Sequence, residues 1–177
     1  MEPLAENLFL LEAERWKPLR LKLSPIFTSS KLKEMFPLVL ECARNLEEFL
    51  DKVADNGEPV DCREMSAKFT IDVIGSCAFG ISINALEDDG NKFRRMGRQI
   101  LTPTFKTITR NIIKQFATSL IKVFGRFLQS TEIDNFFISL VHDTMEYREN
   151  NNVHRLDMIN MLMELKKHPD KVNNIGE

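Results

Sequence analysis

Apolar residues recur at intervals of three and four along most of this chain, and this period constrains the fold more than any other feature. The clearest stripe lies between Pro37 and Asn56, and its members are Leu38, Cys42, Leu46, Phe49, Leu50 and Val53. These positions share one face of an α-helix. The alternating pattern of a half-buried strand is missing, and only seven Gly and seven Pro interrupt the helical period. We therefore predict an all-α chain.

Proline, glycine and capping residues divide this pattern into helices with short joints. Ser24-Pro25 ends the first helix, because a proline disfavours helix for the residue before it. Asn56-Gly57 ends the second helical region, and Pro37 is expected to divide that region into a short turn and a longer helix. The predicted helical regions are about 12–23, 31–55, 61–79, 91–102, 104–128, 131–149 and 157–167.

Length, composition and charge exclude several classes of protein. A chain of 177 residues with 43% hydrophobic and 28% charged residues suits one domain with a real core. The formal net charge of −2 at pH 7 gives no global basic field, so we expect no nucleic-acid partner. No stretch reaches the ~18 consecutive apolar residues of a membrane span. Met1–Asn7 lack the features of a signal peptide, so any membrane anchor is expected outside this chain.

The residue types that usually bind metals or transfer protons form no recognisable site. Cys42, Cys62 and Cys77 are odd in number, and their spacings of 20 and 15 suit neither a zinc pair nor a disulfide framework. We expect them to be reduced and mostly buried. The histidines and the paired acids are expected in solvent: His142, His154, His168, Glu47-Glu48 and Asp88-Asp89. We assign no catalytic residue and no metal ligand.

Trp16 and Arg20 stand four residues apart in the first predicted helix and therefore share one face. An indole N–H only donates hydrogen bonds, and a guanidinium carries several donors and no acceptor. Together the two side chains could converge on a carboxylate. The same spacing also serves cation–π packing on an ordinary helix, so these two residues alone leave both interpretations open.

A long motif surrounds this pair. Leu23–Phe36 reads Leu-Ser-Pro-x-Phe-Thr-Ser-x-Lys-Leu-Lys-x-Met-Phe after the Trp-x-x-x-Arg. With four later segments it resembles the insect microsomal cytochromes P-450 of the xenobiotic-detoxifying type. Those segments are Lys68–Gly80, Phe93–Gly97, Phe136-Phe137 and Tyr147–Asn151. The resemblance implies that residues 1–177 form a single partial domain, an internal fragment from the third to about the eighth lettered helix of that fold, without most of its β-sheet.

The resemblance also implies a function. The parent protein would be a haem-dependent monooxygenase that oxidises lipophilic small molecules with O₂ and electrons from NADPH-cytochrome P-450 reductase, on the cytosolic face of the endoplasmic reticulum membrane. Trp16 and Arg20 would hold the haem propionates. The family's iron-ligating cysteine lies in a glycine-rich loop, and none of the three cysteines here has such a loop. We therefore expect the chain alone to be catalytically inactive.

The basic segment, residues 90–130, contains nine basic residues and no acidic one. Large apolar residues are interleaved with these cations, a pattern that suits an anionic membrane surface. The resemblance places Met96, Ile100 and Leu101 beside substrate. A pair of core-covering helices with solvated cations is the competing structural interpretation. The alternative function is a non-enzymatic helical protein that binds a membrane or a partner through this segment.

Overall fold

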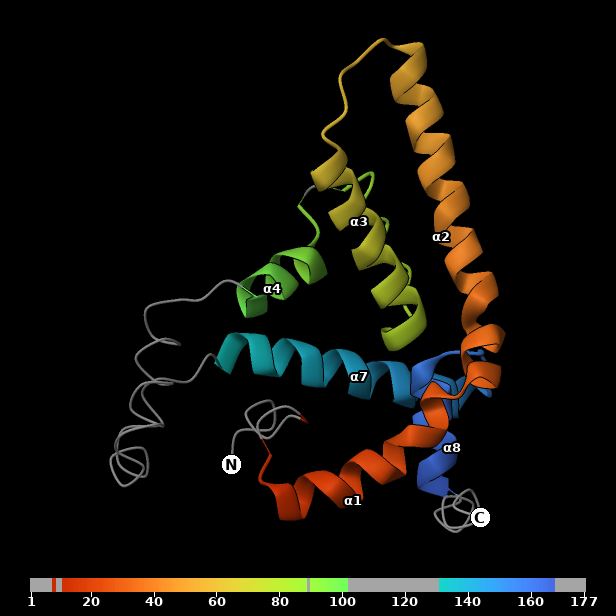
Figure 1. The fold of residues 1–177 in the computed structure, drawn as a ribbon, viewed down its shortest axis with the longest axis vertical. Helices are drawn as coiled ribbons and strands as arrows, with labels where there is room; N and C mark the ends of the chain where they lie inside the picture. Colours follow the sequence, from red (N-terminus) through yellow and green to blue (C-terminus); the bar gives the residue numbers. More distant parts are fainter. Residues whose placement is uncertain (1–7, 9–10, 89, 102–130, 168–177) are drawn as a thin grey trace, which may run out of the picture.

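The computed structural model describes residue 8 and residues 11–88, 90–101 and 131–167 of the 177-residue chain, with only the backbone described at Leu101 and Thr131. The elements are α1 (Ala13–Leu23), η1 (Ser24–Phe27), α2 (Ser29–Asp55), α3 (Cys62–Ile74), η2 (Gly75–Phe79), α4 (Lys92–Leu101), α7 (Thr131–Asn151) and α8 (Met158–Lys167). Throughout these ranges every regular element is helical (Figure 1), which confirms the predicted all-α class. The helix predicted at 104–128 lies outside the described residues.

The helices surround the short η2 segment, which is one turn of π-helix at the end of α3. The long helix α2 and the shorter α3 stand beside each other, and α7 runs across below them (Figure 1). α4 packs on α7, while α8 contacts η1, η2 and α7. The contact between α8 and η1 joins the first and last parts of the described chain.

The apolar core lies where α4, α7 and η2 meet. Phe93 of α4 forms edge-to-face contacts with Phe79 of η2, at 5.1 Å between ring centroids, and with Phe137 of α7, at 5.5 Å. Met96 and Ala85 complete the fully buried centre of this cluster. Each such aromatic pair adds about 0.5–1.5 kcal/mol beyond the area it buries, so these three elements hold one another in place.

α2 is one continuous helix across Pro37, so the predicted division at this residue is wrong. A proline inside a helix removes one backbone hydrogen bond and costs ~3 kcal/mol. Here the proline is exposed, while Met35 before it and Cys42 after it are both buried. The buried face therefore continues past the proline, and packing along 27 residues outweighs one lost hydrogen bond.

Most of the predicted helix ends are confirmed by their capping geometry. Asn56 ends α2, and Gly57 follows with φ +64. The Asp61 carboxylate accepts hydrogen bonds from the backbone N–H groups of Arg63, at 2.9 Å, and Glu64, at 3.2 Å, and so caps α3. The carboxylate of Glu64 pairs with Arg94 of α4.

Few side chains of α7 and α8 are fully buried. Met158, Met161, Leu162 and Leu165 of α8 are half-buried. The buried residues of this helix are Ile159 and Met163. On α7, Tyr147 is 61% exposed, whereas its neighbour Arg148 is buried.

Large apolar side chains are exposed about as often as they are buried. Among the described residues, eleven apolar residues are buried and thirteen large ones are exposed, including Leu32, Phe36 and Leu40 along one side of α2. No helix in the described ranges is long and apolar enough to cross a membrane. These exposed side chains therefore mark helix faces that lack a packing partner within the described residues.

Candidate functional site

α1 places Trp16 and Arg20 one turn apart on the same face. The helix begins at Ala13, where the backbone N–H groups of Arg15 and Trp16 donate to the Glu12 carbonyl at 3.0 and 2.8 Å. The helix then continues through Pro18, which lies beyond the first turn. Trp16 is 42% exposed and Arg20 is exposed as well. The start of α1 predicted from the sequence is confirmed, and with it the geometric requirement for a shared site.

The Arg20 guanidinium has a neutral partner. Its Nη1 donates to the Ser24 hydroxyl at 2.9 Å, and that hydroxyl donates to the Arg20 carbonyl at 2.8 Å. No carboxylate of the described residues pairs with Arg20. The cation–π contact formed in the described region joins Lys92 to Phe136, at 5.1 Å from Nζ to the ring centroid, and does not involve Trp16. Spare donors on an exposed guanidinium beside an indole N–H fit the carboxylates of haem.

The three cysteines are free thiols, and none of them lies in a glycine-rich loop. Cys42 is buried in α2, and Cys77 is half-buried in η2. Burial raises the pKa of both thiols, which keeps them protonated and therefore poor metal ligands. Cys62 is exposed at the first residue of α3, so the expectation of burial is wrong for this residue. Its helix begins at the end of the molecule opposite α1 (Figure 1).

The sequence analysis did not predict the largest buried polar cluster of the described residues. Arg148 at the end of α7 and Asp157 before α8 form a buried, two-pronged ion pair, with Nη1–Oδ1 at 2.7 Å and Nη2–Oδ2 at 2.6 Å. Arg155 adds its Nε at 3.6 Å from Asp157 and donates to Ser76 of η2 at 2.5 Å. Both arginines also donate to the Gly80 carbonyl, at 3.5 and 3.3 Å. The cluster therefore ties α7, α8 and η2 together.

The sequence carried a signal for this cluster. Phe137, Val141 and Thr144 follow one another along one face of α7, and Arg148 occupies the next position on that face. A charged residue at an inward position requires a buried partner. Asp157 has the position and residue type of a helix cap, and its carboxylate accepts from the Asn160 backbone N–H at 3.0 Å. Periodicity could have indicated the arginine, but only the fold pairs it with this aspartate.

Gly80 completes the cluster by leaving room for it. Its φ of +66 lies in the left-handed region that favours glycine. A Cβ at this position would meet the Arg148 guanidinium and would lie 2.6 Å from Asp157 Oδ2. Gly75 similarly allows Ile83 to approach closely. Ile83 belongs to the chain that follows η2.

A second buried carboxylate lies between α3 and the chain that follows η2. Asp72 accepts from the Ala85 backbone N–H at 2.8 Å and is 7% exposed. Burial raises the pKa of Asp72, while hydrogen bonds from the Ala85 and Leu86 backbones and the nearby Lys68 charge oppose this effect. This carboxylate holds residues 83–86 against α3, so it has a structural role.

An apolar groove of about 920 Å³ lies between α3, α4 and α7. Its apolar lining is formed mainly by Ile71, Ile74, Phe79, Phe93, Ile100, Phe137, Ile138, Val141 and Met145. The hydroxyls of Ser66 and Thr70 also face it, but they already donate to carbonyls of their own helix at 2.7 and 2.8 Å. Ile100 borders this groove, whereas Met96, which was also expected beside substrate, is only 1% exposed and belongs to the core. The groove therefore suits an apolar occupant.

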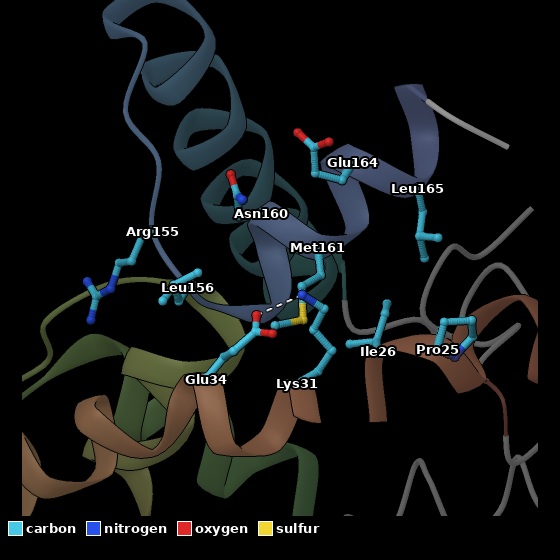
Figure 2. Close-up of a pocket in the computed structure, with 10 residues that line it drawn as sticks. All are labelled: Pro25, Ile26, Lys31, Glu34, Arg155, Leu156, Asn160, Met161, Glu164 and Leu165. Atoms are coloured by element: carbon cyan, nitrogen blue, oxygen red, sulfur yellow. Dashed lines mark hydrogen bonds and ion pairs between the residues drawn. The ribbon is translucent and has the colours of Figure 1, made fainter. Parts of the chain in front are cut away.

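A smaller pocket of about 190 Å³ lies between η1, the start of α2 and α8 (Figure 2). Pro25, Ile26 and Leu165 form part of its apolar wall, and an ion pair between Lys31 and Glu34, 2.7 Å long, stands at its edge. Binding sites for drug-sized ligands usually measure about 300–1,000 Å³. This pocket is too small for haem or for a large lipophilic substrate.

Comparisons with known proteins decide the family. The family model described as Cytochrome P-450 matches residues 1–175. The chain belongs to the cytochrome P-450 family. It is 35% identical over 176 residues to Cytochrome P-450 6A1 of Musca domestica, covering 99% of this chain and 34% of that protein. It is 37% identical over 177 residues to Probable cytochrome P-450 6a21 of Drosophila melanogaster, covering 99% and 35%.

A third insect relative gives the same result. Cytochrome P-450 6k1 of Blattella germanica is 37% identical over 173 residues, covering 98% of this chain and 33% of that protein. This cytochrome P-450 chain thus spans about a third of the length of the curated relatives it matches. The family and the insect origin implied by the motifs are confirmed.

Cations in the described part of the basic segment make internal contacts. Arg94 of this cytochrome P-450 chain is buried and paired with Glu64, and Lys92 lies over the Phe136 ring. These two residues fit the interpretation of α4 as a core-covering helix. Five of the nine basic residues, at 106–126, lie outside the described residues, so the predicted membrane contact through them stays a prediction.

His142, Asp143 and Glu146 bring their ligand atoms within 4.8 Å of one another on α7. All three side chains are exposed, and their spacing of one and four residues on a helix is enough to bring them together. His142 lies inside α7 and is exposed as predicted. His154 is exposed as predicted, and His168 lies outside the described residues.

Proposed function

We propose that this chain is part of a haem-dependent monooxygenase in which Trp16 and Arg20 bind the haem propionates. The proposal rests on the exposed Trp16–Arg20 face of α1, where the described residues give the guanidinium a neutral partner, the Ser24 hydroxyl. When bound, haem supplies the oxygen chemistry of this family, which inserts one atom of O₂ into a lipophilic molecule using reductase-supplied electrons. NADPH-cytochrome P-450 reductase is the proposed electron donor.

The chemistry of the two side chains supports this role. Haem carries two carboxylates, and a guanidinium binds a carboxylate through two parallel N–H donors. The indole N–H can add one further donor on the same side of the helix. α1 itself has no buried residue, and its C-terminal end continues into η1, which contacts α2 and α8. Neither residue takes part in bond breaking, and we assign no catalytic residue in this chain.

We infer that this chain alone is not catalytically competent. Iron in this family requires a cysteine thiolate. Cys42 and Cys77 are held protonated by burial, and Cys62 is the first residue of α3, which begins well away from α1 (Figure 1). We accordingly propose that residues 1–177 form one partial domain of a longer protein at the cytosolic face of the endoplasmic reticulum membrane. Mixed with hemin and reduced under carbon monoxide, the chain should show no thiolate-type absorption band.

The groove between α3, α4 and α7 supports a lipophilic occupant. We propose that Ile100, which is 54% exposed at its edge, borders substrate in the complete protein. The chain spans only a third of its relatives, so we also propose that further polypeptide covers part of this groove. In the isolated chain the groove should bind a dye that fluoresces in apolar surroundings, and Ile138→Glu at its lining should weaken that binding.

Hemin titration of the 177-residue chain tests the proposed site directly. Trp16 is the only tryptophan, so quenching of its fluorescence reports hemin bound near α1. Arg20→Ala should weaken hemin binding roughly tenfold or more, because a hydrogen bond to a charged group contributes about 1.5–3 kcal/mol. Lys22→Ala removes another exposed cation of α1 and should change the affinity less than about twofold. Equal effects of the two substitutions would overturn the proposed site.

A second candidate function is binding to an anionic membrane through the basic segment. The acid-free composition of residues 90–130 favours it. The pairing of Arg94 with Glu64 counts against a large contribution from α4. Co-sedimentation of the chain with phosphatidylserine vesicles tests the idea: binding that falls with salt supports it, and equal recovery with neutral vesicles contradicts it.

A further inference from the structure

Ser24 holds Arg20 through two hydrogen bonds at the end of α1. The Arg20 Nη1 donates to the Ser24 Oγ at 2.9 Å, and the same Oγ donates to the Arg20 carbonyl at 2.8 Å. We propose that Ser24 is a positioning residue, which aims the Arg20 guanidinium at the haem propionates. This inference rests on the proposed function, and it adds a residue that touches neither haem nor substrate.

The direction of both bonds follows from the atoms. A guanidinium has no acceptor, so the hydroxyl oxygen must accept from it. The single hydroxyl hydrogen is then free to donate to the Arg20 carbonyl, which lies one turn back along the helix. The pairing consumes one Nη1 donor and leaves the Nε and Nη2 edge for a carboxylate. Ser24 therefore orients the cation without competing for its charge.

The backbone at Ser24 is itself well fixed. Its N–H donates to the Arg20 and Leu21 carbonyls at the end of α1. Ile26 of η1 is only 2% exposed, so the segment that follows Ser24 is anchored in the molecule. The Ser24 hydroxyl is therefore held in place and can orient the long Arg20 side chain. An arginine on an exposed helix otherwise keeps ~2 kcal/mol of rotamer entropy, which it would lose on binding haem.

Spacing supports the same interpretation. Trp16, Arg20 and Ser24 recur every four residues and therefore follow one another along one side of α1 and its end. The indole, the guanidinium and the hydroxyl thus form a single polar row. Thr28, a further four residues along, does not extend it, because its hydroxyl donates to the Pro25 carbonyl at 3.3 Å. Thr28 is therefore a matched control, a nearby hydroxyl with no contact to Arg20.

The first test measures hemin affinity through the fluorescence of Trp16. Ser24→Ala should weaken hemin binding about fivefold, the effect of one ordinary hydrogen bond. Ser24→Thr keeps the hydroxyl and should restore affinity to within about twofold, and Thr28→Ala should change it less than twofold. In the Arg20→Ala background, Ser24→Ala should have no further effect. An equal loss in both backgrounds, or no loss in either, would overturn the positioning role.

The second test requires no hemin. The ¹⁵N order parameter of the Arg20 Nε–H bond, compared with that of Arg63, measures how firmly the side chain is held. Ser24→Ala should lower it for Arg20 and leave it unchanged for Arg63, whereas an unchanged value for Arg20 contradicts the inference. If wild-type Trp16 is not quenched by hemin, the proposed function fails while this measurement still decides whether Ser24 orients Arg20.

Discussion

Arg20 and Arg148 show two opposite uses of the same side chain. Arg148 is 4% exposed, and the Asp157 carboxylate takes two of its donors in a closed pair. Arg20 is exposed, and its side-chain partner among the described residues is a neutral hydroxyl, that of Ser24. A buried arginine whose charge is neutralised by its own chain stabilises the fold and has little left for a ligand. An exposed arginine oriented by a neutral group keeps its charge available for one.

Removing each arginine should separate these roles most strongly. Arg148→Ala leaves the Asp157 carboxylate buried without its main partner, and we expect a loss of about 3–5 kcal/mol in the free energy of unfolding. Arg20→Ala should cost less than ~0.5 kcal/mol, since an exposed residue without a charged partner adds little. Urea denaturation followed by circular dichroism measures both. Comparable losses for the two variants would show that the distinction is wrong.

Alanine substitutions at Gly80 and Gly57 test how tightly the chain packs around the buried Arg148–Asp157 ion pair. Gly80 and Gly57 have almost the same φ, +66 and +64, so an alanine is equally strained at either position. Around Gly57 nothing lies within 4 Å of a new Cβ, whereas at Gly80 it would meet the ion pair. Gly80→Ala should therefore destabilise the chain by about 1–3 kcal/mol more than Gly57→Ala. Equal losses in the free energy of unfolding, measured by urea denaturation, would mean that the ion pair moves aside for the new Cβ at little cost.

We expect the smallest effect on stability from Asp72. The direction in which this effect changes with pH follows from the burial of its carboxyl group. The pKa of Asp72 is raised above 3.8, its ordinary value, so the folded state holds this proton more tightly than the unfolded state does. Its stabilising contribution is present below pH 3.8 and is lost as pH rises through the folded-state pKa. Stability of the wild type should therefore fall relative to Asp72→Asn between these limits, measured by urea titrations at several pH values. A constant difference between the two proteins would contradict this.

Sequence patterns predicted the parts of the fold that depend on local order. The periods of apolar residues identified the helices, and Asp61, Asn56 and Gly57 marked ends that the structure confirms. The proline rule failed at Pro37, because local preference cannot weigh one lost bond against the packing of a long helix. The family motif named the Trp16–Arg20 pair, and the observed start of α1 keeps the two residues on one face.

The sequence alone could not predict contacts between distant segments. Arg94 and Glu64 lie 30 residues apart, and the Ser76–Arg155 bond joins residues 79 apart. Each of these side chains could equally have been solvated, since a single charged or polar residue does not name its partner. Ser24 is close to its partner in the sequence, yet its hydrogen bond was not predicted either. Its spacing from Arg20 was visible in the sequence, but its bond to the guanidinium depends on the backbone at the α1–η1 joint.

Esterifying the carboxylates of haem removes the charges that Arg20 and Trp16 are proposed to bind. Hemin and hemin dimethyl ester share the flat macrocycle and differ only in the charged arms, so their affinity ratio isolates the contribution of Arg20 and Trp16. We expect the wild-type chain to bind hemin roughly tenfold more tightly than the ester, and Arg20→Ala to abolish this preference. Equal binding of hemin and its ester to the wild type, with the same quenching of Trp16, would contradict it.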